Sequence, residues 1–207
     1  MTIDDRLTTL GALWSVWRDQ GTSLTDEQWQ RPTRLGDWDV RSLYAHAGSW
    51  PFGLSHLVGT VRDVEPTYPT AAALLRDFNR PDGIARRNRD RVAAGAREDA
   101  ATYSTAQMIE TFASVGPSAI ATARQLGPVV VDYFGLAALR LDEVISVGIV
   151  EATVHLLDLQ RALGLPPDVP ADGVAHTTDV LAQMAPPVDF IEVATGRSGA
   201  ELFPLMV

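Results

Sequence analysis

A carboxylate and an imidazole within an apolar stretch are the strongest candidates for chemistry in this chain. Glu151 and His155 stand four positions apart in IVEATVHLLDL. In a helix this spacing places both side chains on one face, about 5–6 Å apart at Cβ. Polar groups are costly to bury among aliphatic side chains unless something pairs with them. The spacing therefore suits two ligands of one metal ion, or a Glu–His pair bonded only to each other.

A second histidine lies much earlier in the chain. His46 stands in LYAHAGSW, on the side of its predicted helix that carries the apolar residues. Trp38 and Trp50 flank it in the sequence and could line a pocket around it. Taken alone, this setting is typical of a core histidine with a hydrogen-bond partner. His56 lies about 80° further around an ideal helix and is predicted to be peripheral.

His176 provides an internal comparison for the Glu151–His155 spacing. It follows Asp172 at the same interval, but Asp172 stands at the predicted start of a helix, where it would cap the backbone. The Asp172–His176 pair is therefore predicted to be solvated. The spacing alone therefore does not define a metal site, and the burial of the pair has to distinguish a site from a solvated pair.

The amino-acid composition excludes several kinds of chemistry. The chain has no cysteine, which excludes disulfides, Cys-ligated zinc, iron–sulfur clusters and a cysteine nucleophile. All 17 basic residues are arginine, which excludes a catalytic lysine and a Schiff base. No G-x-S-x-G, G-x-G-x-x-G or G-K-[ST] motif occurs, which weighs against serine α/β-hydrolases, Rossmann enzymes and P-loop NTPases. H-E-x-x-H is missing too.

The charge balance is acidic, with a formal net charge of −9 over 207 residues. One arginine cluster lies within residues 86–91, but nearby carboxylates offset it, so we expect no nucleic-acid partner. The N-terminus lacks the features of a secretory signal, and no stretch approaches the roughly 18–20 apolar residues of a membrane span. We expect a cytoplasmic protein that acts on a small molecule.

Hydrophobic residues recur at intervals of three and four, which predicts a mainly α-helical protein. We expect one domain over residues 1–207, built as an antiparallel helical bundle with short extra elements. The expected helices span residues 3–20, 40–61, 70–78, 81–99, 105–126, 143–163 and 171–185, with a helical turn at 25–29.

Single residues are expected to shape these helices. Gly21 is predicted to end the first helix, and Asp142 to cap the long apolar helix that follows it. Pro51 is predicted to kink or interrupt the second helix, because proline lacks the amide proton of the intrahelical bond. The pair Gly116-Pro117 predicts a bend.

Two segments have strand character. Residues 129–134 form a β-branched run, and the tail over residues 187–207 begins with an alternating pattern in VDFIEVATG. We therefore expect two short strands that pair beside the bundle.

Two separated motifs resemble one known family. They are WQRPTRLGDWDVRSLYAH at residues 29–46 and EATVHLLDL at residues 151–159. In this order they resemble the N-terminal domain of mycothiol-dependent maleylpyruvate isomerases, which belong to the DinB-like superfamily of four-helix bundles. Residues 60–140 match that family only loosely. The resemblance implies a DinB-like antiparallel four-helix bundle with short additional helices.

The resemblance also implies a metal site. Matched motif by motif, His46, Glu151 and His155 would be the ligands of a divalent metal, usually taken to be zinc. Three protein ligands leave a fourth position open, which is typical of catalytic rather than structural zinc. Asp158 matches the aspartate of the family motif and would support the ligands from outside or act in capping.

Thiol chemistry is the activity that the resemblance implies. A low-molecular-weight thiol, mycothiol in actinobacteria, would bind as a thiolate at the open position and attack a small electrophilic substrate. The reaction would be a transfer or a cis–trans isomerisation. Arg41, Arg76 and Arg80 are candidates for binding carboxylates. Homodimers are common among similar bundles.

One departure from the family bears on the substrate. Maleylpyruvate isomerases carry a further C-terminal domain, and the residues after Gly164 are too few for it, which favours a shorter relative with another substrate. Three functions stay open: a thiol S-transferase or isomerase, a metal-dependent amide or ester hydrolase with Asp158 as its only ready base, and a non-catalytic bundle that binds a metal or ligand.

Overall fold

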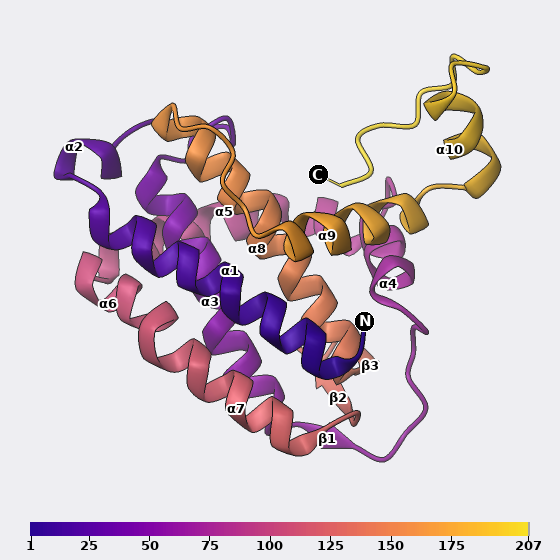
Figure 1. Cartoon of the computed structure of the whole chain (residues 1–207), viewed down its shortest axis with the longest axis horizontal. Helices are drawn as coiled ribbons and strands as arrows, with labels where there is room; N and C mark the ends of the chain where they lie inside the picture. The colour runs from indigo at the N-terminus through magenta and orange to yellow at the C-terminus, as the bar shows by residue number, and fades with distance from the viewer. Residues whose placement is uncertain (207) are drawn as a thin grey trace.

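The computed structural model describes residues 1–206, and four long helical segments form its central bundle (Figure 1). Helix α1 packs against α7 and α8, and α3 packs against the same two. α1 and α8 run in one direction and α3 and α7 in the other (Figure 1). The neighbours α3 and α8 are therefore antiparallel. The bundle helices are α1 (Ile3–Ser23), α3 (Val40–Leu57), α7 (Gly116–Leu126) and α8 (Leu141–Leu163).

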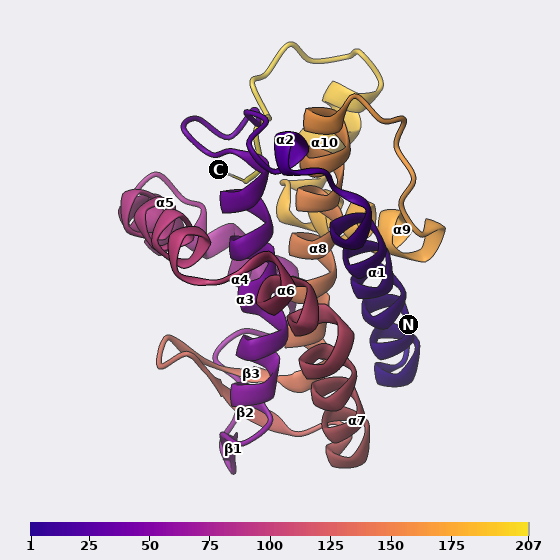
Figure 2. The same cartoon turned by 90° about the vertical axis from the view of Figure 1, so that its left-hand side faces the viewer.

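Further helices surround the bundle. α5 covers one side of α3 (Figure 2), and α9 packs against α8 and has α4 beside it (Figure 1). These helices are α2 (Asp26–Trp29), α4 (Ala71–Phe78), α5 (Ile84–Thr102), α6 (Thr105–Glu110), α9 (Ala171–Met184) and α10 (Pro187–Ala194). The expectation of a mainly α-helical, DinB-like bundle is confirmed. Within residues 1–206 no helix is both long and apolar enough to cross a membrane.

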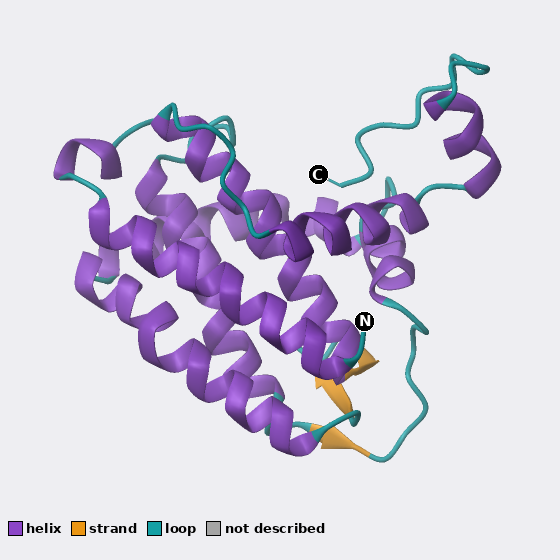
Figure 3. Ribbon diagram, in the orientation of Figure 1, coloured by secondary structure: helices purple, strands orange, loops and turns teal. Residues whose placement is uncertain are grey.

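A small antiparallel sheet closes one end of the bundle (Figure 3). Its strands are β1 (Val61–Arg62), β2 (Val130–Tyr133) and β3 (Ala137–Arg140), in the order β1-β2-β3. Val131 pairs with Val61 on one side and with Leu139 on the other. The sheet leads directly into α8 and so sets where that helix begins.

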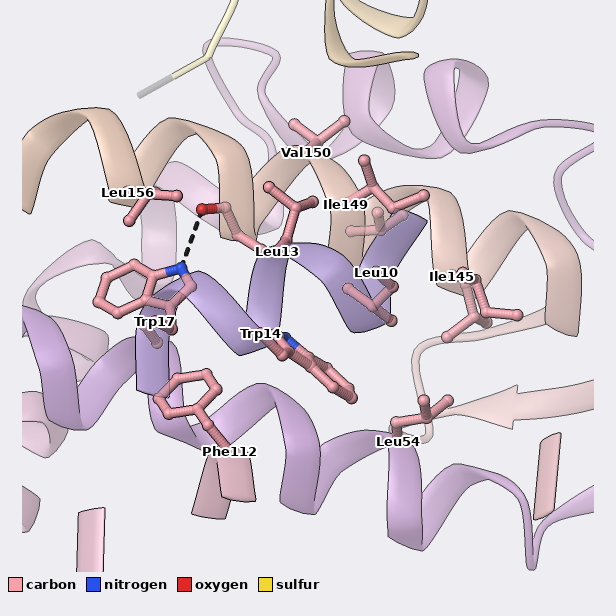
Figure 4. Close-up of a cluster of buried hydrophobic side chains, with 14 of the residues drawn as sticks. Leu10, Leu13, Trp14, Trp17, Leu54, Phe112, Ile145, Ile149, Val150 and Leu156 are labelled. Atoms are coloured by element: carbon pink, nitrogen blue, oxygen red, sulfur yellow. Dashed lines mark hydrogen bonds between the residues drawn. The ribbon is translucent and has the colours of Figure 1, made fainter. Parts of the chain in front are cut away.

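The core is centred on α1, whose leucines and tryptophans face α8 and α7 (Figure 4). Trp17 is fully buried, stacks on Phe112 with ring centroids 5.6 Å apart, and donates a hydrogen bond from Nε1 to the carbonyl oxygen of Ala152 at 3.1 Å (Figure 4). Ala152 directly follows Glu151. This hydrogen bond therefore fixes the position of α8 next to the candidate ligand Glu151.

The prediction for Gly21 was wrong, because the first helix continues through it to Ser23. A Cβ atom at Gly21 would lie 2.3 Å from Tyr44 Oη, so the glycine leaves room for the Tyr44 ring. The Tyr44 hydroxyl donates to the carbonyl oxygen of Trp17 at 2.9 Å. The Tyr44 ring, which reaches from α3 to the last turns of α1, thus explains a glycine that resembles a helix terminator.

Pro51 does not interrupt α3, which is helical from Val40 to Leu57. The helix ends earlier than predicted, and Val61, which was expected at its end, forms β1 together with Arg62 instead. Asp39 caps the start of α3 as expected, accepting a hydrogen bond from the Ser42 amide at 2.8 Å.

The bend expected at Gly116-Pro117 takes the form of a π-helical turn over Thr111–Val115. The Gly116 amide donates to the carbonyl oxygen of Thr111, five residues back. Pro117 cannot donate in the next turn and would crowd the carbonyl four residues before it, so a wider turn relieves the contact. A Cβ atom at Gly116 would lie 2.7 Å from the Trp14 ring, so this position also needs glycine.

Two further predictions were wrong. The tail expected as a strand forms α10, since Pro187 starts a helix well and the apolar residues also fit helical spacing. β2 therefore pairs with β1 and β3, not with the tail. Arg140, not Asp142, is the N-cap of α8. Asp142 lies in the first turn and accepts a hydrogen bond from Arg140 Nε at 3.0 Å.

Candidate metal centre

The antiparallel pair α3 and α8 brings the three predicted ligands together. His46 comes from α3, and Glu151 and His155 come from successive turns of α8. One ligand atom from each lies within 4.8 Å of the other two. All three side chains are about four-fifths buried, with exposed fractions of 19%, 20% and 16%. The cluster is thus largely shielded from water, but each of its side chains keeps some contact with solvent.

The distances within the cluster suit a shared cation better than direct hydrogen bonds. Glu151 Oε2 lies 3.5 Å from His155 Nε2 and 3.9 Å from His46 Nε2. Good N–H···O hydrogen bonds are shorter, at about 2.7–3.2 Å. Ligand bonds of about 2.0–2.2 Å to one zinc ion would put neighbouring ligand atoms roughly 3.3 Å apart. A modest contraction would therefore let one ion contact all three residues.

Asp158 holds the His155 ring in position from one turn further along α8. Its Oδ2 atom lies 3.0 Å from His155 Nδ1, and its Oδ1 atom accepts a hydrogen bond from Arg34 Nε at 2.6 Å. The Asp158 side chain is 2% exposed. A carboxylate at Nδ1 favours the tautomer with its proton there, which leaves the Nε2 lone pair directed at the cluster. Asp158 thus supports the candidate ligands and does not cap a helix.

The loop between α2 and α3 adds an aromatic wall to the site. The Thr33 amide and hydroxyl both donate to the carbonyl oxygen of Trp38, which fixes the loop. The Trp38 ring is nearly buried, with its centroid 5.0 Å from that of His46 and 6.4 Å from that of His155. Trp38 therefore lines the site as expected. Trp50 packs instead toward α8 at Gly148, where a Cβ atom would lie 3.5 Å from its ring.

The charges in the cluster stabilise one another. Burial acts to raise the pKa of Glu151, but its contacts with His155 and His46 outweigh this and hold the pKa well below its usual range. Burial acts to lower the pKa of His155, but Asp158 and then Glu151 raise it to about 9. Protons and a metal ion would therefore compete for the same nitrogen of His155.

The pKa of Tyr133, a residue of β2, is affected by the charge of Glu151. Burial raises the pKa of Tyr133 above its usual range, and the negative charge of Glu151 adds to this effect. The Tyr133 hydroxyl therefore stays protonated at neutral pH. Sequence reasoning did not single out Tyr133 or Arg34, because neither has a spacing relationship to the ligands.

The other histidines lie apart from this cluster. His56 is exposed, as predicted. The prediction that His176 is solvated was wrong, since the residue is only 8% exposed. Burial lowers its pKa, with a further contribution from Arg6. The same carboxylate–histidine spacing thus gives two different environments, depending on which helices cover it.

The three arginines proposed for carboxylate binding have other surroundings. Arg41 donates to the backbone carbonyls of Ala100 and Tyr103 and so ties α3 to the end of α5. Arg80 pairs with Asp77 at 3.2 Å, and Arg76 is exposed. The guanidinium that reaches the candidate centre is that of Arg34, through Asp158.

The fold and this cluster define a DinB-like helical bundle with a candidate His–Glu–His metal site. Comparison with known families matches residues 10–160 to the mycothiol maleylpyruvate isomerase N-terminal domain. The chain therefore belongs to this family. The matched region includes all three candidate ligands and Asp158. No curated protein and no solved structure matches the chain.

Proposed function

We propose that this protein is a metal-dependent thiol transferase or isomerase, which uses a low-molecular-weight thiol of the mycothiol type on a small electrophilic substrate. The observation that carries the proposal is the convergence of His46, Glu151 and His155 within 4.8 Å. Membership in the mycothiol maleylpyruvate isomerase family supports the thiol as co-substrate.

The donor set suits a catalytic divalent cation. The set offers two imidazole nitrogens and one carboxylate oxygen. Zinc and its transition-metal neighbours favour such nitrogen ligands, whereas magnesium and calcium favour oxygen ligands only. With three protein ligands, a fourth position is free for an exogenous molecule. When bound there, the cation would lower the pKa of a thiol, so that it is available as a nucleophile at neutral pH.

Residues around the cluster would prepare it for this chemistry. Asp158 holds the proton of His155 at Nδ1, and Arg34 balances the charge of Asp158. The Trp38 ring lies beside the two histidine rings and would limit their freedom to turn away from the ion. Glu151 stays ionised at neutral pH, because its contacts with the two histidines keep its pKa low. The site thus combines a fixed ligand set with some contact with solvent.

The surroundings of Asp158 favour thiol chemistry over hydrolysis. A hydrolase on the same centre would need a general base within reach of an attacking water. Asp158, the base considered for that reaction, has one oxygen bound to His155 and the other to Arg34, and it is 2% exposed. Asp158 is therefore unavailable to an attacking water.

Metal analysis tests the first half of the proposal. Protein purified without a His tag is expected to contain about one divalent metal ion per chain by inductively coupled plasma mass spectrometry. His46→Ala, Glu151→Ala and His155→Ala should each lose it, whereas His176→Ala should retain it. Full metal content in His155→Ala would overturn the assignment of the centre.

Thiol consumption tests the second half. The metal-loaded protein is incubated with mycothiol and monochlorobimane, a small electrophile whose thiol adduct is fluorescent. We expect adduct formation faster than in buffer, and loss of this rate in Glu151→Ala. If the protein contains metal but accelerates adduct formation with none of the electrophiles tried, the proposed activity is wrong and the protein is a non-catalytic metal-binding bundle. Turnover of esters or amides without thiol would instead establish a hydrolase.

A further inference from the structure

A cavity of about 460 Å³ lies between α3 and the segment formed by the end of α5, α6 and the π-helical turn. We call it the α3–α6 cavity. Its volume falls within the range of small-molecule sites, about 300–1,000 Å³. The residues that define it here are Gly48, Phe52, Asp99, Tyr103, Met108 and Glu110.

The α3–α6 cavity is separate from the candidate metal centre. Of the α3 residues that line the cavity, Ala45, Gly48 and Phe52 lie between about 100° and 160° around the helix from His46, and Ser49 lies about 60° away, by the geometry of an ideal helix. None of the three candidate ligands lines the cavity. α3 thus presents His46 to α8 on one face and the cavity wall to α5 and α6 on another. A ligand in the cavity would not need the metal.

The floor of the cavity is apolar and is left open by a missing side chain. Met108 is buried beneath it. A Cβ atom at Gly48 would meet only Phe112 Cε2, at 3.9 Å, which is ordinary contact. Gly21 and Gly116 are needed for close packing, but no such contact requires a glycine at position 48. The absence of a side chain there instead keeps the cavity deep.

The rim of the cavity is negatively charged. Asp99 and Glu110 both line it, and no arginine or histidine does. Among residues 1–206, no basic side chain forms an ion pair with either carboxylate. Glu110 accepts a hydrogen bond from Ser114, which leaves its charge uncompensated. Arg41 is bound to the backbone of α5 and is not part of the lining.

Two aromatic rings complete the rim. Phe52 and Tyr103 are 53% and 42% exposed, from α3 and from the end of α5 respectively. Exposed aromatic faces attract organic cations, and the attraction grows when the cation is partly desolvated. Carboxylates without a basic partner, together with aromatic rings above an apolar floor, are complementary to a cation that carries an apolar body.

We propose that the α3–α6 cavity binds a small amphipathic organic cation, an ammonium group attached to an aromatic or aliphatic body. The apolar body lies over Gly48 and Met108, and the ammonium group lies between Asp99 and Glu110 near the rings. This site is independent of the metal centre and of the activity proposed for it.

Three probes of nearly equal shape test the charge preference. They are 4-phenylbutylamine, 4-phenyl-1-butanol and 4-phenylbutanoate, titrated into the full chain by isothermal calorimetry at pH 7.5 and low salt. We expect the amine to bind at least tenfold more tightly than the alcohol, and the carboxylate to bind most weakly. Equal affinity for amine and alcohol would overturn the proposal.

Variants locate the binding. The double variant Asp99→Asn/Glu110→Gln should reduce the preference for the amine to less than threefold while retaining the alcohol. Gly48→Leu should fill the cavity and abolish binding of all three probes. The control is Ala94→Leu, at an exposed position of α5 about 140° around the helix from Asp99, and it should bind like wild type.

Two further measurements keep the test decisive. Circular dichroism and metal content are compared for every variant, and both are expected to match wild type, because none of the changed residues touches the metal ligands. If Gly48→Leu does not fold, Gly48→Ala should still weaken the amine severalfold. Amine binding that survives both the cavity-filling and the charge-removing variants would place the site elsewhere and overturn the assignment.

Discussion

The Nδ1 atom of His155 lies 3.0 Å from the Oδ2 atom of Asp158, on the same face of α8. The same carboxylate is bound on its other oxygen by Arg34, from the loop that precedes α3. A chain of three residues therefore links a surface loop to the Nε2 atom that faces His46 and Glu151. This arrangement explains why a nearly buried aspartate lies beside the cluster without being a candidate ligand itself.

Replacing Asp158 with asparagine is expected to weaken metal binding by about 10- to 100-fold, as loss of such supporting carboxylates commonly does. The amide lacks the negative charge that favours a proton on His155 Nδ1. The measurement is competition with a chromophoric chelator. Asp172→Asn, which precedes His176 at the spacing of Glu151 and His155, is the control and should bind metal like wild type. Unchanged affinity in Asp158→Asn would contradict the supporting role.

The part of the site that lies within one helix was predictable from the sequence. Glu151 and His155 share a face because of helical periodicity, and the structure confirms this. Nothing local indicates that His46 meets them, since that depends on how α3 packs against α8. The family resemblance supplied this pairing, because it carries tertiary information that spacing lacks.

The errors in the sequence analysis also have tertiary causes. Gly21 looks like a helix terminator, but the ring of Tyr44 requires the small residue there. His176 has the spacing of a solvated pair, but α1 and α4 cover it together with α8. The segment of α10 satisfies both strand and helix periodicity, and Pro187 at its start favours the helix. In each case the local pattern was compatible with two structures and packing selected one.

Metal binding should stabilise the fold, because an ion held by His46, Glu151 and His155 connects α3 to α8. A ligand present at 100 times its Kd and bound only to the folded state adds about 2.7 kcal/mol, or roughly 5–10 °C in Tm for a chain of this size. Differential scanning calorimetry with zinc and with EDTA measures the difference. In His46→Ala the two traces should coincide. A zinc-dependent rise that persists there would show that the ion binds elsewhere.

The buried His176 should make the unfolding free energy fall in mild acid. Burial and Arg6 lower its folded-state pKa, with Glu143 and Asp179 acting in the opposite direction. The unfolded state therefore binds the proton more readily, and stability is lost as the pH falls below about 6.5. Urea unfolding in EDTA between pH 7.5 and 5 should show a flatter profile for His176→Gln. One proton limits the difference to about 1.4 kcal/mol per pH unit. Parallel profiles would contradict the prediction.

The contact between Gly21 and Tyr44 predicts opposite effects for two glycine substitutions. Gly21→Ala places a Cβ atom 2.3 Å from Tyr44 Oη and forces the ring away from the carbonyl oxygen of Trp17, to which it donates. Overpacking of this kind costs about 1–3 kcal/mol. Gly95→Ala has open space in α5 and should gain about 0.5–1 kcal/mol from helix propensity. Urea unfolding measures both changes, and a Gly21→Ala variant as stable as wild type would show that the Tyr44 ring does not lie this close to Gly21.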